Sequence, residues 1–348
     1  MNDNAATNAK MQTRKLQKVG GSTFTVSVPK RWARAHGLEA GDDIHLHGHD
    51  DGSLVVRSAQ MDGGDLANVC IAVRSAANDA VERALRAAYV TGFEEIELVT
   101  DDGFSADQRR TASSLAKTLV GTEVITESED RIAVRNLLDP ADVSIRQSLI
   151  QLQFVSLSMH RAATAAVAGD ATADHVPGRD DEVDRLFAMI THHFNRSLTD
   201  FAELDHLGVG RTELFECYLT ARQLERVADH AVEIARIAKH LDAPDGDEAN
   251  PPGQIVVEIE AVAEQARQVV EDATDAVLDG DAAEAAHRAL DLRDETVAEA
   301  EALDRALFEQ APDDAYRLTR VLDSLVRTAE YGGNVAELAV QSAVRSWE

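Results

Sequence analysis

The 348-residue sequence predicts a multidomain α+β protein with a small β domain, a small α/β linker domain and an all-α region of tandem three-helix bundles. Three observations predict this class. Short alternating apolar runs punctuated by glycine come first, and strand-like and helix-like patterns then alternate. From about residue 141 onward the apolar period is helical only. We expect domains at 11–58, 64–138, 141–241 and 254–348.

The first domain is predicted as two β-hairpins around a short helix. Gly20 and Gly21 mark the turn of the first hairpin, and Pro29 suits the first turn of the helix. The expected elements are strands at 14–19 and 23–28, a helix from Pro29 to Ala35, and strands at 43–47 and 53–57. A domain of about 45 residues makes a poor core alone, so we expect a homodimer or a higher even oligomer.

The same domain is basic although the chain is acidic. The whole sequence has 34 Lys and Arg against 62 Asp and Glu, a formal net charge of −28. Residues 10–36 nevertheless hold seven basic residues and no acid. Contact with phosphate groups is the usual physical reason for such a segment, and counterion release makes that contact salt-dependent.

The acidic residues are spread along the chain, and only six lysines occur. This pattern is typical of a protein solvated in very high salt, and an acidic interaction surface is the alternative. Cys70 and Cys217 are too few for a disulfide framework. Residues 1–10 do not form a signal peptide, and no apolar run reaches about 18 residues. We therefore expect a cytoplasmic protein without membrane insertion.

The middle segment is predicted as a βαβαββ unit. Strands are expected at 68–74, 95–100, 121–126 and 131–137, and helices at 78–90 and 105–119. Ser105 is the expected N-cap of the second helix. The segment has no Gly-rich phosphate loop and no nucleophile arrangement. A linking or dimerising role is therefore the first expectation, and a small-ligand site is the alternative.

The helical region contains an internal repeat. Six helices are expected, at about 142–169, 180–204, 211–241, 254–279, 281–310 and 313–346. The longest break, 242–253, divides them into two groups of three. Residues 226–235 align with 327–336, and Asp181-Glu182 aligns with Asp294-Glu295. Both the second and the third helix of each group therefore repeat in order, which indicates a duplicated bundle.

The third predicted helix carries an acidic column beside its apolar stripe. Glu225, Asp229 and Glu233 are spaced four residues apart, so they are neighbours on one helix face and repel one another. The column requires a cation, very high salt, or basic groups from another helix.

The basic N-terminal segments resemble a known DNA-binding fold. Residues 14–22, 26–32 and 37–42 are similar to the AbrB/SpoVT swapped-hairpin family, in which two chains interleave their hairpins. The resemblance implies DNA as a partner, with contacts from Arg14, Lys15, Lys18, Lys30 and Arg31. A dimerisation or toxin-binding module without DNA is the alternative.

The helical region resembles the PhoU family through residues 180–186 and 225–231. In that family, E(D)xxxD motifs carry metal ions, and members regulate phosphate uptake through the Pst phosphate transporter and its sensor partners. The resemblance implies a metal site in the first bundle, for a divalent cation or for iron or zinc. Its expected ligands are Asp181, Asp184, Glu225 and Asp229. A solvated helix face is the alternative.

The second bundle departs from this pattern. Val326 stands where the first copy has Glu225, and Val297 where it has Asp184. We therefore expect any metal cluster in the first bundle and none in the second.

Together the segments resemble archaeal phosphate-uptake regulators that join an AbrB/SpoVT domain to PhoU. We expect a DNA-binding transcriptional regulator of phosphate uptake. The alternative is an adaptor that docks on the Pst transporter ATPase or a signalling partner without using DNA. An enzyme is not expected, because the paired carboxylates, which could support metal-assisted hydrolysis, come without a nucleophile set.

Overall fold

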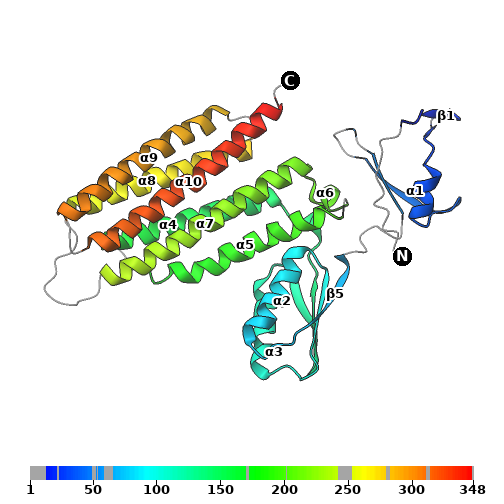
Figure 1. Cartoon of the computed structure of the whole chain (residues 1–348), viewed down its shortest axis with the longest axis horizontal. Coiled ribbons are helices and arrows are strands. Elements are labelled where there is room, and N and C mark those ends of the chain that lie inside the picture. Colours follow the sequence, from blue (N-terminus) through cyan, green and yellow to red (C-terminus); the bar gives the residue numbers. More distant parts are fainter. Residues whose placement is uncertain are drawn as a thin grey trace, which may run out of the picture. The chain divides into compact units, whose positions relative to one another are not determined.

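The computed structural model describes residues 13–21, 23–48, 52, 54–58, 66–169, 172–200, 202–241, 253–279, 283–310 and 314–346. The chain divides into two compact units, residues 1–64 and residues 65–348, and each is described by itself (Figure 1). The break predicted at 242–253 lies almost wholly outside the described residues.

The first unit contains the two predicted hairpins. β1 (Gln17–Val19) pairs with β2 (Thr23–Thr25), and β3 (Ile44–Gly48) pairs with β4 (Leu54–Ser58), both antiparallel. α1 (Lys30–Ala35) follows Pro29, which is its N-cap. The first two strands are shorter than predicted, because residues 14–16 and 26–28 lie outside the ladder. A hairpin with no packed face is marginal in water, which accounts for the short pairing.

This first unit has apolar side chains but no core. Among the side chains described between residues 13 and 56, none is buried. Leu16, Phe24 and Leu46 are 69%, 66% and 58% exposed. The exposure of several large apolar side chains in so small a unit is unusual for a free surface and typical of an interface.

The second unit begins with the predicted βαβαββ order. Its elements are β5 (Asn68–Ala72), α2 (Asn78–Thr91), β6 (Glu95–Val99), α3 (Ala106–Thr118), β7 (Thr122–Glu127) and β8 (Arg131–Asn136). The strand order is β5-β6-β8-β7, with β5 parallel to β6 and the other neighbours antiparallel. Ser105 and Gln108 form a capping box that starts α3, as predicted for Ser105.

Helices α2 and α3 lie on one side of this sheet (Figure 1). Their buried side chains, such as Leu85 and Leu115, share a core with Leu98 and Ile132 of the strands. This packing explains the alternating apolar pattern of β6, whose Ile96 and Leu98 are buried while its other residues are half-buried.

The helical region follows. The first three long helices are α4 (Ile145–Val167), α5 (Val176–Ser197) and α7 (Arg211–Leu241), with the short α6 (Ala202–Leu207) between the last two. The other three are α8 (Gly253–Asp279), α9 (Ala283–Gln310) and α10 (Ala315–Ser346). Each set of three packs as a bundle, and α7 also packs along α10 (Figure 1). One apolar core runs through both bundles.

The second predicted helix, 180–204, is wrong in its bounds and its continuity. α5 begins at Val176, and the Pro177-Gly178 pair that suggested a break lies in its first turn, where proline is tolerated. The helix ends at Ser197, and Asp200 Oδ1 then accepts a hydrogen bond from the backbone N–H of Ala202 at 3.0 Å. This cap starts α6 as a separate helix.

Helices α8 and α10 of the second bundle approach closely at Gly332 of α10. A Cβ atom at this position would lie 2.8 Å from Val269 Cγ1 and 2.9 Å from the backbone nitrogen of Val270 in α8. The glycine therefore allows the backbones of α8 and α10 to pack together. In the described part of the chain, no helix is long and apolar enough to cross a membrane.

Candidate functional site

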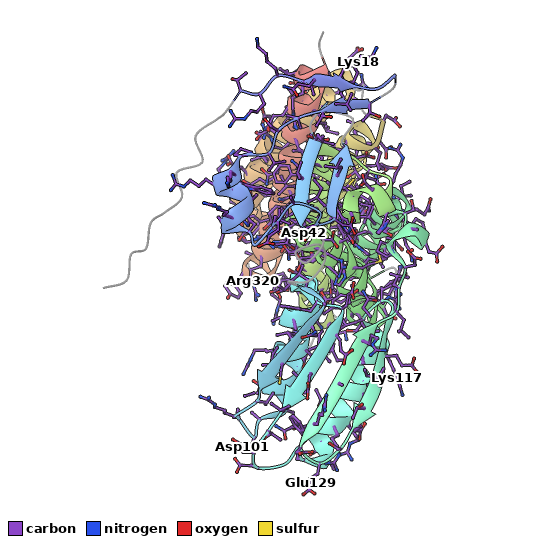
Figure 2. All side chains as sticks on the ribbon, turned by 90° about the vertical axis from the view of Figure 1, so that its right-hand side faces the viewer. Lys18, Asp42, Asp101, Lys117, Glu129 and Arg320 are labelled. Atoms are coloured by element: carbon purple, nitrogen blue, oxygen red, sulfur yellow. The ribbon has the colours of Figure 1, made fainter. Side chains whose placement is uncertain are left out.

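The five predicted DNA-contact residues all lie in the first unit and are exposed. Lys18 is on β1, where it pairs across the ladder with Phe24, and Lys30 and Arg31 begin α1. Arg14 and Lys15 lie in the extended segment before β1 rather than in the predicted strand. Figure 2 shows Lys18 on the first hairpin with its side chain directed outward. Exposed cations on hairpins and at a helix start are available to phosphate groups.

The predicted metal ligands lie on two neighbouring helices of the first bundle. Asp181 and Asp184 come from α5, and Glu225 and Asp229 come from α7. α5 packs directly on α7, so their facing carboxylates lie near each other. Asp181 and Asp229 are exposed, whereas Asp184 and Glu225 are half-buried.

Burial and mutual repulsion disfavour the charged forms of these acids. The pKa of Glu225 is raised to about 7, mainly by burial and then by the nearby charges of Asp229 and Asp184. Burial is also the largest cause of the raised pKa of Asp184, which Asp229 and Asp181 raise as well while Arg86 lowers it. The carboxylates of α5 and α7 therefore act on one another across the helix–helix interface.

Asp180 belongs to the same acidic set, and sequence reasoning missed it. Its pKa is raised by burial and then by the charges of Asp184, Asp229 and Asp181. The available signal was spacing: Asp180 and Asp184 are four residues apart, like Glu225 and Asp229, and residues four apart share one helix face.

One cation from the α/β domain reaches this set. Arg86 of α2 places Nη1 at 3.4 Å from Asp184 Oδ2 and Nη2 at 3.8 Å from Glu82. Arg86 of the α/β domain thus supplies part of the positive charge that the acidic column requires. Farther along the column, Glu233 is paired with Arg236 of α7 and with Arg320 of α10.

The chemistry of the set suits a hard cation, because all its donors are carboxylate oxygens and its field is negative. In the conformation described, however, no group of three or more His, Cys, Asp or Glu side chains is arranged to hold a metal ion among the residues that could be searched. Without a cation between them, the negatively charged carboxylates repel one another, and this repulsion keeps their oxygens apart.

The second bundle is different at the corresponding positions. Glu330 is paired with Arg327 at 2.7 Å, and Asp294 with Arg293 at 2.8 Å. Asn334 donates to Gln223 of α7 at 3.3 Å. These acids therefore already have arginine counter-charges, whereas Glu225 has a raised pKa among other acids.

Two family models match the chain. The first, a PhoU domain, matches residues 149–238, and the second, antidote-toxin recognition MazE, a bacterial antitoxin, matches residues 17–63. The first match covers α5 and most of α4 and α7, and the second covers both hairpins. The chain therefore carries a MazE-type domain followed by a PhoU domain.

Two solved structures are similar to part of this chain. PhoU from Pseudomonas aeruginosa has 20% sequence identity and a TM-score of 0.45, over 58% of this chain and 96% of that chain. The phosphate transport system regulatory protein PhoU from Streptococcus pneumoniae has 17% identity and a TM-score of 0.43, over 59% of this chain and 94% of that chain. No curated protein matches this chain.

Proposed function

We propose that this chain, which joins a MazE-type domain to a PhoU domain, is a cytoplasmic DNA-binding regulator of phosphate uptake. The observation that carries the proposal is the charge of the first domain. In a chain with net charge −28, the segment around β1 and α1 is basic, and its cations are exposed. A surface that holds cations in so acidic a chain is suited to a polyanion, and DNA is the polyanion that a transcriptional regulator binds.

DNA binding through this domain requires two copies. The exposed Phe24 and Leu46 have no core within one chain, and a second copy that covers them would give the unit a core. Pairing would also present two sets of Lys18, Lys30 and Arg31 on one dimer. Their contacts would be mainly to phosphate, so they would position the protein without reading sequence.

Chromatin immunoprecipitation with and without phosphate would locate the binding sites, and full-length protein would then be titrated onto the recovered DNA. We expect affinity to fall with salt, and Lys18→Gln and Lys30→Gln each to reduce the log–log salt slope by about 1.8, because each substitution removes two phosphate contacts from a dimer. Lys117→Gln is the control, because Lys117 is an exposed lysine at the end of α3 (Figure 2). A flat salt slope, or equal effects of all three variants, would exclude DNA contact through this domain.

The PhoU half would supply the regulatory input. We propose that Asp180, Asp181, Asp184, Glu225 and Asp229 hold a divalent cation, or iron or zinc. A bound cation would neutralise the acidic set and tie α5 to α7. The support is the all-carboxylate donor set and the raised pKa values of Asp180, Asp184 and Glu225.

The two bundles allow a matched test of this metal proposal. Asp229→Ala should lower bound metal, measured by elemental analysis of the purified chain. Glu330→Ala at the equivalent position should leave it unchanged, because Glu330 is paired with Arg327. Equal metal loss in both variants, or no metal in the wild-type chain after loading, would contradict the assignment.

An adaptor that docks on the Pst transporter ATPase is the competing function. It shares the PhoU half but does not need the exposed cations of the first domain. Phosphate-dependent occupancy of DNA would favour the regulator, whereas retention of the transporter ATPase on the chain without any DNA occupancy would favour the adaptor.

A further inference from the structure

A basic cavity lies where the last turns of α7 in the first bundle meet the first turns of α10 in the second bundle. It has a volume of about 510 Å³ and is open to solvent. Arg236 and His240 line it from the last turns of α7, and Tyr316, Arg317 and Arg320 line it from the first turns of α10. Arg320 lies at the surface of the helical region in Figure 2. None of these residues belongs to the acidic set or to the DNA-contact residues.

Three arginines around one cavity are unexpected in this chain. Acids outnumber basic residues by 62 to 34, so an average surface hollow would be acidic. Glu233 is the one acid among the described lining residues, and it is shared by Arg236 and Arg320. Arg317 is paired with Asp314 at 3.5 Å. A guanidinium has five N–H donors, so these ion pairs leave donors for a further anion.

The two helix ends contribute opposite fields. The N-terminus of α10 favours an anion beside Tyr316 and Arg317, whereas the C-terminus of α7 disfavours one. His240 and Arg236 lie at that C-terminal end. His240 Nδ1 donates to the Arg236 carbonyl oxygen at 2.7 Å. The arginine side chains outweigh the dipole of α7, because they carry full charges.

The volume of the cavity and the side chain of Tyr316 indicate which class of ligand the cavity can hold. Pockets of about 300–1,000 Å³ hold small organic ligands, so this cavity has room for more than a lone phosphate ion. The side chain of Tyr316 is 73% exposed at the cavity, and an exposed ring offers a face on which a base stacks. The planar, positively charged guanidinium group of arginine can donate two parallel hydrogen bonds to the oxygens of a phosphate group.

We propose that this cavity binds a nucleoside di- or triphosphate, with its phosphates on Arg236, Arg317 and Arg320 and its base on Tyr316. The ligand would bridge α7 of the first bundle and α10 of the second, so its binding would hold the two bundles together at this end. The proposal concerns ligand binding alone and stands whether or not the first domain binds DNA.

Isothermal titration of the full-length chain with ADP tests it, in buffer with EDTA so that metal held elsewhere cannot bridge the nucleotide. We expect ADP to bind, Arg236→Gln and Arg320→Gln each to weaken binding about ten-fold or more, and Tyr316→Ala about five-fold or more. Arg288→Gln should have no effect, because Arg288 is an equally exposed arginine on α9 away from the cavity. Circular dichroism would verify that each variant is folded.

Three results would overturn the proposal. The first is no heat of binding with either ADP or ATP. The second is affinity that survives both arginine variants, or falls equally in Arg288→Gln. The third is that pyrophosphate binds as tightly as ADP and that Tyr316→Ala does not change the affinity for ADP. The cavity would then bind phosphate groups without recognising a base.

Discussion

Arg196 and Glu203 form a buried ion pair at the junction of the α/β domain and the first bundle. Arg196 Nε donates to Glu203 Oε2 at 3.0 Å, and both side chains are almost fully buried. His193 Nδ1 donates to the other oxygen of Glu203 at 2.5 Å. Arg196 also donates to Glu94 beside the sheet at 2.5 Å and to the Gly92 carbonyl oxygen at 3.3 Å. One guanidinium thus joins α5, α6 and the end of α2.

Replacing this arginine should destabilise the protein strongly. Burial by itself would raise the pKa of Glu203, and the hydrogen bond and charge of His193 together with the charge of Arg196 lower it overall. Arg196→Met would leave that buried carboxylate without its main cation, at a cost of about 3–5 kcal/mol. Chemical unfolding would measure the loss.

Arg185→Met is the control, because Arg185 is an exposed arginine on the same helix. A similar loss in both variants would show that the effect comes from the helix rather than from the ion pair.

Acid should weaken the same junction through His192. Its Nδ1 donates to the Tyr89 carbonyl oxygen at 2.7 Å, and its Nε2 accepts from Asn136 Nδ2 at 3.2 Å, which requires a neutral ring. The pKa of His192 is lowered to about 4, mainly by burial and then by the charge of His193. The unfolded chain binds this proton near pH 6.5, so stability is complete above that pH and falls as the pH drops toward 4.

The expected slope from His192 is about 1.4 kcal/mol per pH unit within that window. Unfolding free energies measured between pH 8 and pH 5, at constant high salt, would show it. His192→Gln should be less stable at pH 8 but have a flatter profile. An unchanged slope would assign the acid sensitivity to other groups, such as His160, whose pKa is lowered to about 3 by burial and by Arg267.

A methyl group at Gly332 should push α10 away from α8 within the second bundle. Gly332→Ala would place Cβ against the backbone of α8, which cannot move without shifting the whole helix. We expect a loss of about 1–3 kcal/mol and a lower melting temperature by calorimetry.

Gly178→Ala is the matched change, because Gly178 lies in α5 with open space around it. It should stabilise by about 0.5–1 kcal/mol through helix propensity. Equal effects of the two substitutions would mean that the close approach at Gly332 is unimportant.

A charge on the first hairpin should prevent dimerisation. Phe24→Asp would place a carboxylate on the apolar surface that we propose a second copy covers. Sedimentation analysis should show the wild-type chain as a dimer and the variant as a monomer, with DNA affinity reduced together with assembly.

Phe308→Asp is the comparison, because Phe308 on α9 is similarly exposed, at 62%. It should leave the assembly unchanged. A wild-type monomer would contradict the proposed dimer, as would a dimer that survives Phe24→Asp.

The sequence predicted the fold well where periodicity and turn residues agree. Ser105 identified the start of α3 correctly, and the single apolar period from about residue 141 onward identified the long helices. It failed at α5, where Pro177 indicated a break although proline is compatible with a first turn. It also failed at Asp200, because its role as a cap depends on a hydrogen bond that no pattern in the sequence reveals.

The candidate sites were predictable to different extents. Spacing placed Glu225 and Asp229 on one helix face, yet the position of Asp180 opposite them depends on how α5 packs against α7. The arginine cavity was not predictable, because Arg236 and Arg320 are 84 positions apart in the sequence and meet only through bundle packing. Local patterns describe one helix at a time and do not give the angle or register between two helices.

The buried Arg196 also determines at which positions domains of this chain can be exchanged with those of related proteins. Residues 66–138 are joined to α5 by a guanidinium, a histidine and the close approach of Gly92, where a Cβ would lie 3.0 Å from Arg196 Cβ. Exchanging that α/β segment between related proteins would require compatible residues on α5 as well. The first unit is a separate compact body that ends at Gly64. Chimeras that carry a foreign N-terminal domain should therefore be joined near residue 64 rather than near residue 140.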